Sequence, residues 1–187
     1  MNNRLLVSVL ILFQMLWGAS NGPCADLNDH KLHLGIKMFP ALIGGNLDLS
    51  GQTDKKGTLL LLIVYEENRG VGEQVARTMN LSGKVIDTFP FQVEVCTVSE
   101  LKTFAERPVA GVFLVESLAA EPMEKVTAFG VVKQSIVFSP FEGDVQKGVL
   151  AGMDISTQVK PALNLATLRK SGIRLNALFI KVAKTYE

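Results

Sequence analysis

The feature that most constrains the fold of this sequence is an apolar run from Thr58 to Tyr65 that does not alternate with polar residues. A strand with one solvated face alternates, whereas a strand covered on both faces is apolar throughout. The run therefore predicts an interior strand of a parallel sheet. Because parallel strands need long crossover connections, which are usually helical, helices are expected to flank that sheet.

The rest of the chain alternates apolar runs with helical patterns, which is typical of a βα protein. Further strands are predicted at 91–96, 109–115 and 135–138. Helices are predicted from helical spacing or from a capping box: Leu32, Ile36, Phe39 and Ile43, ending near Pro40 and the Gly44-Gly45 pair; Val71, Val75 and Met79; Thr97–Glu100; and 119–132.

The rhythm changes in the last third of the chain. Strands are predicted at 149–155 and 159–164, and the link between them is too short for a crossover, so we expect a hairpin. A closing helix is predicted from one apolar face, formed by Leu175, Leu178, Phe179, Val182 and Ala183. The expected fold is α/β: a mostly parallel sheet of about six strands flanked by helices, with a C-terminal hairpin and closing helix.

The first 25 residues have the pattern of a secretory signal peptide. Arg4 precedes an apolar run from Leu5 to Gly18, and a stretch of small and polar residues follows. The run is shorter than the roughly 20 residues that a membrane-spanning helix needs. We therefore expect an exported protein in which residues 26–187 form a single domain.

Two cysteines leave two alternatives open. If the leader is cleaved after Ser20, Cys24 and Cys96 both remain in an oxidising compartment and can pair. If it is cleaved after Ala25, Cys96 stands alone in a predicted strand, where a lone cysteine is usually a small core residue.

The charges are balanced and scattered. The chain has 19 basic and 18 acidic residues, and no Lys/Arg cluster stands out. A protein that binds nucleic acid or an anionic membrane carries a basic patch. We therefore expect no nucleic-acid partner.

Patterns typical of catalysis are weak. The only histidines, His30 and His33, lie near the N-terminus, and no Gly-x-Ser-x-Gly elbow occurs. The stretch from Gly70 to Val75 is similar to a dinucleotide-binding loop, but Val75 stands where a small residue is needed and Glu73 would repel phosphate. We expect no enzyme activity, no metal and no cofactor.

A small ligand would bind beyond the carboxyl ends of the strands, because open α/β sheets place their ligands there. The candidate ligand-binding residues at these ends are Glu66, Asn68, Arg69, Glu116, Ser139, Phe141, Glu142 and Asp144. The alternative is that these residues form ordinary polar loops over the strand ends.

Several C-terminal segments carry a more specific pattern: Gln134–Phe141, Lys147–Gly152, Pro161–Asn164, Ser171–Ile173 and Leu175–Lys184. In these segments the chain resembles the YfiR-like family, with Asn164, Gly172, Leu178 and Ala183 at matching positions. Leu32–Pro40 and Thr58–Tyr65 resemble the family's first helix and first strand. Asn164 and Gly172 also have structural interpretations, as a residue that satisfies backbone groups and as a positive-φ turn.

The resemblance implies an exported, periplasmic α/β protein without catalytic activity. Members of the family include regulators that bind a membrane diguanylate cyclase from the periplasmic side and hold it inactive, and they are often dimeric. The expected function is thus regulation of a membrane signalling protein by protein–protein contact. The alternative is a periplasmic small-ligand (solute) binding protein.

Overall fold

The computed structural model describes residues 23–155 and 158–187. The predicted signal peptide lies outside these residues except for its last three positions, with which helix α2 (Pro23–Gly44) begins. Residues 31–187 form one compact unit. Within the described part of the chain, no helix is both long and apolar enough to cross a membrane.

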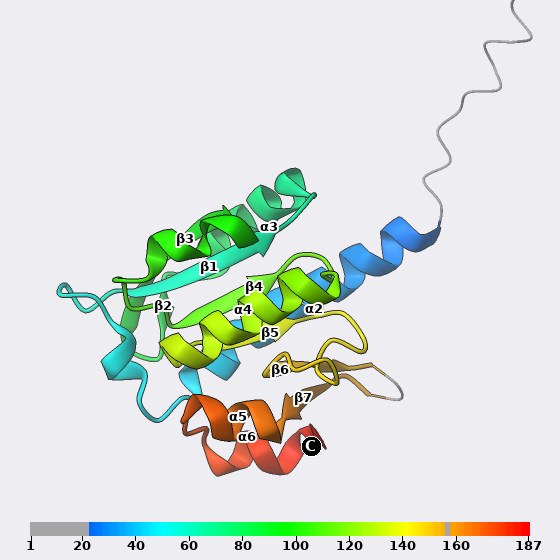
Figure 1. The fold of residues 1–187 in the computed structure, drawn as a ribbon. Coiled ribbons are helices and arrows are strands. Elements are labelled where there is room, and N and C mark those ends of the chain that lie inside the picture. Colours follow the sequence, from blue (N-terminus) through cyan, green and yellow to red (C-terminus); the bar gives the residue numbers. More distant parts are fainter. Residues whose placement is uncertain (1–22, 156–157) are drawn as a thin grey trace, which may run out of the picture. The chain divides into compact units, whose positions relative to one another are not determined.

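One eight-stranded sheet runs through this unit (Figure 1). Its strands are β1 (Leu59–Tyr65), β2 (Val85–Ile86), β3 (Phe89–Thr97), β4 (Gly111–Leu114), β5 (Ile136–Ser139), β6 (Ala151–Asp154), β7 (Lys160–Asn164) and β8 (Lys184–Tyr186). Across the sheet the order is β2-β3-β1-β4-β5-β6-β7-β8. Neighbours from β3 to β6 are parallel, β2–β3 and β6–β7 are antiparallel, and β8 is parallel to β7. The predicted α/β class, parallel sheet and hairpin are confirmed.

The sheet has eight strands where the sequence predicts about six. The two additional strands, β2 and β8, have two and three residues and form the two edges of the sheet. Strand patterns become recognisable only over roughly four residues or more, so runs this short leave no usable signal in the sequence.

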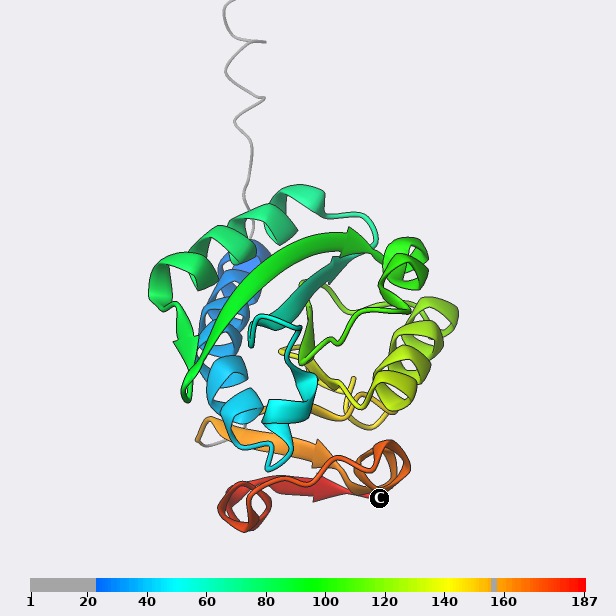
Figure 2. The same ribbon diagram turned by 90° about the vertical axis from the view of Figure 1, so that its left-hand side faces the viewer.

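Helices cover both faces of the sheet, as the apolar run in β1 predicts (Figure 2). Besides α2 they are η1 (Leu49–Gln52), α3 (Arg69–Ser82), η2 (Val98–Phe104), α4 (Ala120–Lys133), α5 (Leu165–Ser171) and α6 (Ala177–Val182). The odd-numbered residues of β1 from Leu59 to Ile63 share a core with α2 and α3. The even-numbered residues from Leu60 to Val64 share a second core with η2 and α4. The strand is therefore buried on both sides.

Three phenylalanines join α2 to the sheet. The ring centroids of Phe39, Phe113 and Phe138 lie 5.5 to 5.7 Å apart, and all three side chains are fully buried. Gly111 of β4 allows this approach, because a Cβ atom at that position would lie only 2.7 Å from Phe39 Cζ. The missing side chain of Gly111 thus sets how closely α2 packs on β4.

The first helix, α2, continues through Pro40 and ends at Gly44, so the predicted end at the Gly44-Gly45 pair is confirmed and an end at Pro40 is not. A proline inside a helix costs about 3 kcal/mol. Leu42 and Ile43, which follow it, are at most 1% exposed, and burying two such side chains contributes roughly 3–6 kcal/mol. Packing therefore outweighs the local cost.

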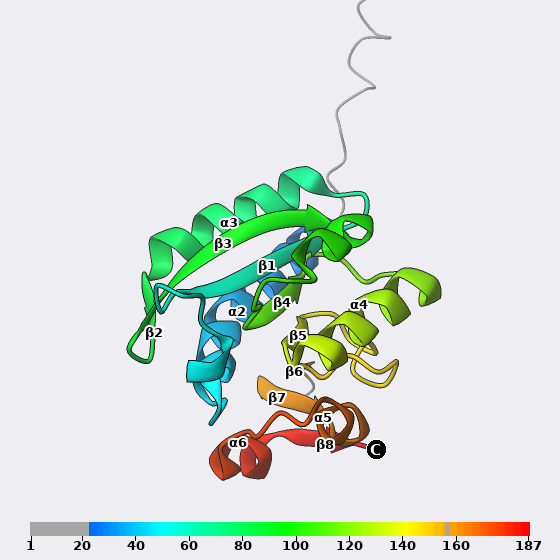
Figure 3. The ribbon, with the colours of Figure 1, turned by 60° about the vertical axis from the view of Figure 1, so that its left-hand side comes forward.

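The predicted closing helix is present as α6, but it is only six residues long and does not close the chain. The C-terminal segment forms the short helices α5 and α6 and then the edge strand β8 (Figure 3). Gly172 ends α5 with a φ of 67°, and the Asn176 side chain begins α6 by accepting the Leu178 N–H at 2.9 Å. The predicted apolar face is buried only in part: Leu175 is 5% exposed and Phe179 packs against the core, whereas Leu178 and Val182 are 65% and 48% exposed.

Candidate functional site

The parallel strands β1, β4 and β5 end at one edge of the sheet, where ligand-binding loops are expected. Glu116, just after β4, holds the loop that follows β1. Its Oε1 atom accepts hydrogen bonds from the backbone N–H groups of Glu66, Glu67 and Asn68, at 2.8, 3.0 and 3.1 Å. Its Oε2 atom accepts a fourth from Asn68 Nδ2 at 2.6 Å.

These contacts fix the charge of Glu116. Burial disfavours the carboxylate, but the hydrogen bonds from the three backbone amides and from Asn68 outweigh it and hold the pKa of Glu116 below its ordinary value. Glu116 is therefore an anion at neutral pH, and its partners all belong to the protein. Its role is to order a loop.

Asp144 has a similar role in the loop that follows β5. Its carboxylate is fully buried and accepts the Ser117 and Ser139 hydroxyl protons, with oxygen–oxygen distances of 2.7 Å in both cases. Lys147 Nζ lies 3.3 Å from Asp144 Oδ1. Ser139 Oγ in turn accepts the backbone N–H of Phe141 at 3.2 Å. The network joins the ends of β4 and β5 and uses both carboxylate oxygens.

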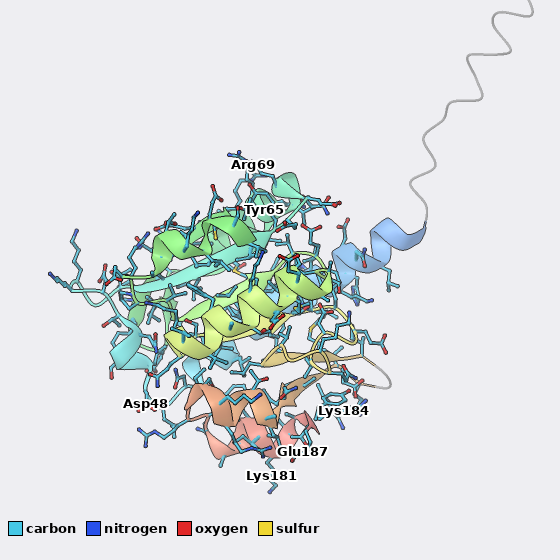
Figure 4. The ribbon with its side chains drawn as sticks, viewed as in Figure 1. Asp48, Tyr65, Arg69, Lys181, Lys184 and Glu187 are labelled. Carbon is cyan, nitrogen blue, oxygen red and sulfur yellow. The ribbon has the colours of Figure 1, made fainter. Side chains whose placement is uncertain are left out.

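Arg69 lies apart from both networks. Its Nε atom donates to Glu73 Oε1 at 2.9 Å, forming an exposed ion pair along α3. Figure 4 shows Arg69 close to Tyr65 at the end of β1, far from Lys184 on β8. The residues predicted from the sequence therefore share an edge of the sheet but do not converge on one point.

Phe141 and Glu142 do line a cavity, which we call the strand-end pocket. It has a volume of about 70 Å³ and lies between the loop after β5 and strands β6 to β8. Its lining residues are Phe141, Glu142, Gly143, Val145, Gln146, Met153, Asp154, Ala162, Lys184 and Tyr186. The pocket combines both signs of charge with apolar and aromatic side chains.

Lys184 is the cation of the strand-end pocket. Its Nζ atom lies 3.1 Å from Asp154 Oδ2 and 5.5 Å from the centroid of the Tyr186 ring. Hydrogen bonding to Tyr186 and Asp154 raises the pKa of Lys184. The ammonium group is therefore held at the pocket by an aromatic ring and a carboxylate.

Sequence reasoning missed Asp154, Lys184 and Tyr186 as site residues. Lys184 and Tyr186 follow Ala183, the last residue of the predicted helix face, and no strand is predicted there, so nothing connected them with a sheet edge. A weak signal was present, because Thr185 and Tyr186 are of types that favour strands.

The residues that match the YfiR-like pattern are structural where their contacts are visible. Asn164 begins α5: its Oδ1 atom accepts the Thr167 N–H at 2.8 Å, and its Nδ2 atom donates to the Val145 carbonyl at 2.9 Å. Gly172 adopts a positive φ. Leu178 is exposed on α6, and Ala183 is the half-buried residue that ends it.

The glycine motif at 70–75 is a helix start. Gly72 lies in the first turn of α3, where a Cβ atom would lie 3.1 Å from Val95 Cγ1. The glycine therefore serves close packing of α3 on β3. His30 and His33 are both exposed, and no group of metal-ligating side chains occurs among the described residues.

Cys96 is a buried free thiol at the end of β3. Of the two alternatives left open by the sequence, this is the one in which Cys96 is a small core residue. Burial, followed by the nearby carboxylates of Glu100 and Glu94, raises the pKa of Cys96 to about 12. Such a thiol is a poor nucleophile at neutral pH.

Comparison with solved structures supports the fold. The chain resembles an ABC domain from Streptococcus pneumoniae, crystallised in complex with L-Trp, with a TM-score of 0.56 and 11% identity over 81% of this chain and 61% of that one. It also resembles a conserved domain protein from Vibrio cholerae, with a TM-score of 0.58 and 12% identity over 81% and 60%. The chain thus spans about three fifths of these structures. No family model and no curated protein matches the sequence.

Proposed function

We propose that this protein binds a small zwitterion of the amino-acid class in the strand-end pocket. The observation that carries the proposal is the grouping of opposite charges beside aromatic rings. Lys184, Asp154 and Glu142 share one cavity with Phe141 and Tyr186. The proposal follows the solute-binding alternative that the sequence left open.

The charges of the pocket suit both ends of a zwitterion. The Lys184 ammonium is a partner for a carboxylate, and the carboxylates of Asp154 and Glu142 are partners for an ammonium group. Lys184 and Asp154 already pair with each other at 3.1 Å. A ligand that separates this pair must give each residue a new partner. A ligand with both charges does so, whereas a ligand with only one charge leaves one of the two residues unpaired.

The size of the pocket indicates which part of the ligand it holds. A cavity of about 70 Å³ has room for a few water-sized groups. That is enough for the ammonium and carboxylate groups of an amino acid. The ligand's side chain then extends along the rings of Phe141 and Tyr186, which favours an aromatic or apolar one.

The fold likeness supports a solute-binding function. The S. pneumoniae domain was crystallised with an amino acid bound. At 11% identity, no residue role carries over from that domain. The argument for this chain therefore rests on its own pocket.

Calorimetric titration with matched compounds tests the proposal. L-tryptophan carries both charged groups, tryptamine lacks the carboxylate, and indole-3-propionate lacks the ammonium. We expect L-tryptophan to bind and each analogue to bind at least about tenfold more weakly, since each loses one charged partner. If the three compounds bind equally, or none binds, the proposal is wrong.

A lysine pair gives a matched variant and control. Lys184→Met removes the proposed carboxylate partner, whereas Lys181→Met removes an exposed lysine of α6 (both are labelled in Figure 4). We expect only Lys184→Met to weaken L-tryptophan binding. Equal affinities for the two variants would remove Lys184 from the site.

A second candidate function, regulation of a membrane signalling protein, has an observation of its own. α6 has no buried residue and exposes Leu178, Ile180 and Val182 at 65%, 37% and 48%. Exposed apolar patches are typical of protein contacts. This candidate keeps the predicted export to the periplasm, the YfiR-like resemblance and the dimer as proposals.

Cross-linking in living cells tests the regulator. A photoreactive residue at Leu178 should capture a membrane protein with a signalling domain, such as a diguanylate cyclase. The same residue at the exposed Leu81 of α3 is the control. Identical capture patterns from both positions would argue against α6 as a docking surface.

A further inference from the structure

A second cavity lies at the other end of the sheet, and we call it the amide pocket. It has a volume of about 260 Å³ and is lined by Asn46, Asp48, Gln52, Gln134, Gly172 and Ile173. η1 precedes β1, and Gln134 precedes β5, so the pocket lies towards the amino ends of these strands. In Figure 4, Asp48 and Lys184 lie towards opposite ends of the strands.

Two largely buried side chains of this pocket, Asn46 and Gln52, each keep one hydrogen-bonding atom open to solvent. Asn46 is 6% exposed, and its Oδ1 atom accepts the Asp48 N–H at 3.1 Å. Gln52 is 8% exposed, and its Nε2 atom donates to the carbonyls of Gln134 and Lys133 at 3.3 and 3.5 Å. Among the described residues, no partner is found for Asn46 Nδ2 or Gln52 Oε1. No buried side-chain nitrogen or oxygen of the described residues lacks a partner, so these two atoms are open to solvent. The pocket thus offers a donor and an acceptor to a ligand.

A third amide comes from an unusual backbone position. Gln134 ends α4 in the left-handed conformation, with a φ of 53°. Glycine or asparagine is the usual residue there, since other side chains strain the backbone. Gly172 ends α5 in the same conformation, and a Cβ atom on it would lie 3.5 Å from Gln134 Nε2. The side chain of Gln134 therefore lies where the two helix ends meet.

The pocket is electrically neutral. Its one carboxylate, Asp48, accepts two hydrogen bonds from the Arg174 guanidinium, one of them at 2.8 Å. The carboxyl ends of α4 and α5 carry partial negative charge, which disfavours anions. Ile173 adds an apolar wall. A ligand for this site is therefore neutral, with groups that both donate and accept hydrogen bonds.

We infer that the amide pocket binds a neutral polyhydroxylated molecule of monosaccharide or cyclitol size. A hydroxyl group can accept from Asn46 Nδ2 and donate to Gln52 Oε1, and the C–H face of a sugar can pack on Ile173. The volume lies just below the roughly 300–1,000 Å³ of sites for drug-sized ligands. This inference is independent of the amino-acid site.

Nuclear magnetic resonance on the purified protein tests the inference, with D-glucose, D-galactose, D-ribose and myo-inositol as probes. We expect at least one probe to give saturable shifts of the side-chain NH₂ signals of Asn46 and Gln134. If no probe does so at millimolar concentrations, or if the shifts occur elsewhere, the inference is wrong.

Two left-handed residues supply the variant and its control. Gln134→Gly removes the third amide and suits the backbone, and Asp87→Gly makes the same kind of change at a φ of 56° in the β2–β3 turn. We expect Gln134→Gly to weaken probe binding about tenfold and Asp87→Gly to leave it unchanged. Asn46→Asp, which keeps the acceptor and removes the donor, should act like Gln134→Gly.

Wild-type affinity in both Gln134→Gly and Asn46→Asp would overturn the assignment. L-tryptophan affinity should be the same in Gln134→Gly as in wild type, because the strand-end pocket is unchanged. Failure of the polyol site is in this way distinguishable from failure of the amino-acid site.

Discussion

The two ends of the sheet use polar side chains in opposite ways. Where the parallel strands end, Glu116 and Asp144 are surrounded by donors from the protein itself, so that each carboxylate holds neighbouring loops together. At the other end, Asn46 and Gln52 are 6% and 8% exposed, and each keeps one hydrogen-bonding atom open to solvent and without a partner among the described residues. The first arrangement indicates a structural role, and the second leaves a donor and an acceptor available to a ligand.

Substitutions at either end of the sheet test this difference between the two groups of polar side chains. Polar changes among the strand-end networks should cost stability, and polar changes in the amide pocket should cost ligand binding instead. The largest effect is expected at a buried side chain near the carboxyl ends of the strands, namely Cys96.

The reactivity of Cys96 should show the largest effect. Its pKa of about 12, against an ordinary 9.0, lowers the thiolate fraction at neutral pH about a thousandfold. We expect iodoacetamide to label Cys96 only after the protein is unfolded in urea, as followed by mass spectrometry. Rapid labelling of the native protein would mean that this part of the sheet opens to solvent.

Removal of the Asp144 carboxylate should have the second largest effect. Asp144→Ala leaves the buried Ser139 hydroxyl without its acceptor and should lower the free energy of unfolding by about 3 kcal/mol. The neighbouring Glu142→Ala changes an exposed carboxylate and should stay within about 0.5 kcal/mol. Urea unfolding of both variants measures the difference, and equal stabilities would contradict a structural role for Asp144.

Glu116→Gln should have a smaller, pH-dependent effect. The amide cannot accept as many N–H bonds, so we expect a loss of about 1–2 kcal/mol at neutral pH. Because the folded pKa of Glu116 is lowered, its stabilisation is complete above the unfolded value of about 4.3 and disappears as the pH falls through the folded value. Wild type and variant should therefore converge in acid.

Glu67→Gln is the control for Glu116, because this exposed side chain takes no part in the loop network. Thermal unfolding over a pH series compares the variants. A destabilisation of Glu116→Gln that is constant down to the acid limit would contradict the account of its charge.

Gln134→Gly should have the smallest effect on folding. Glycine adopts the left-handed conformation without strain, which stabilises the folded state, but it also gives the unfolded chain more conformational freedom. We therefore expect the free energy of unfolding to change by no more than about 1 kcal/mol. Asp87→Gly should behave alike in the same urea titration. A large loss in Gln134→Gly alone would mean that the glutamine is structural.

Much of the fold could be predicted because its signals are local. The buried run in β1, the strands at 91–96 and 135–138, and the capping box of Thr97 and Glu100 all depend on residues close in sequence, and the box makes both of its bonds. The closing helix is shorter than its apolar pattern because the cap at Asn176 separates Leu175 from the helix, which ends at Val182 before the edge strand β8.

The sites were harder to predict because they depend on contacts between distant segments. The strand-end rule found Glu116 and Asp144 at the correct edge, but only the hydrogen-bond partners show that they are structural. Lys184 reaches the strand-end pocket from an edge strand of three residues. Gln52 meets Gln134 across 82 positions of sequence, which no local pattern records.

Mapping L-tryptophan by amide chemical shifts tests the central claim most directly, namely that Glu116 and the loop after β1 hold structure while binding takes place in the strand-end pocket. The account predicts saturable shifts that are largest at Gly143, Ala162 and Tyr186, with little change at 66–68. Shifts that are largest at 66–68 and Glu116, or no saturable shift at all, would contradict it.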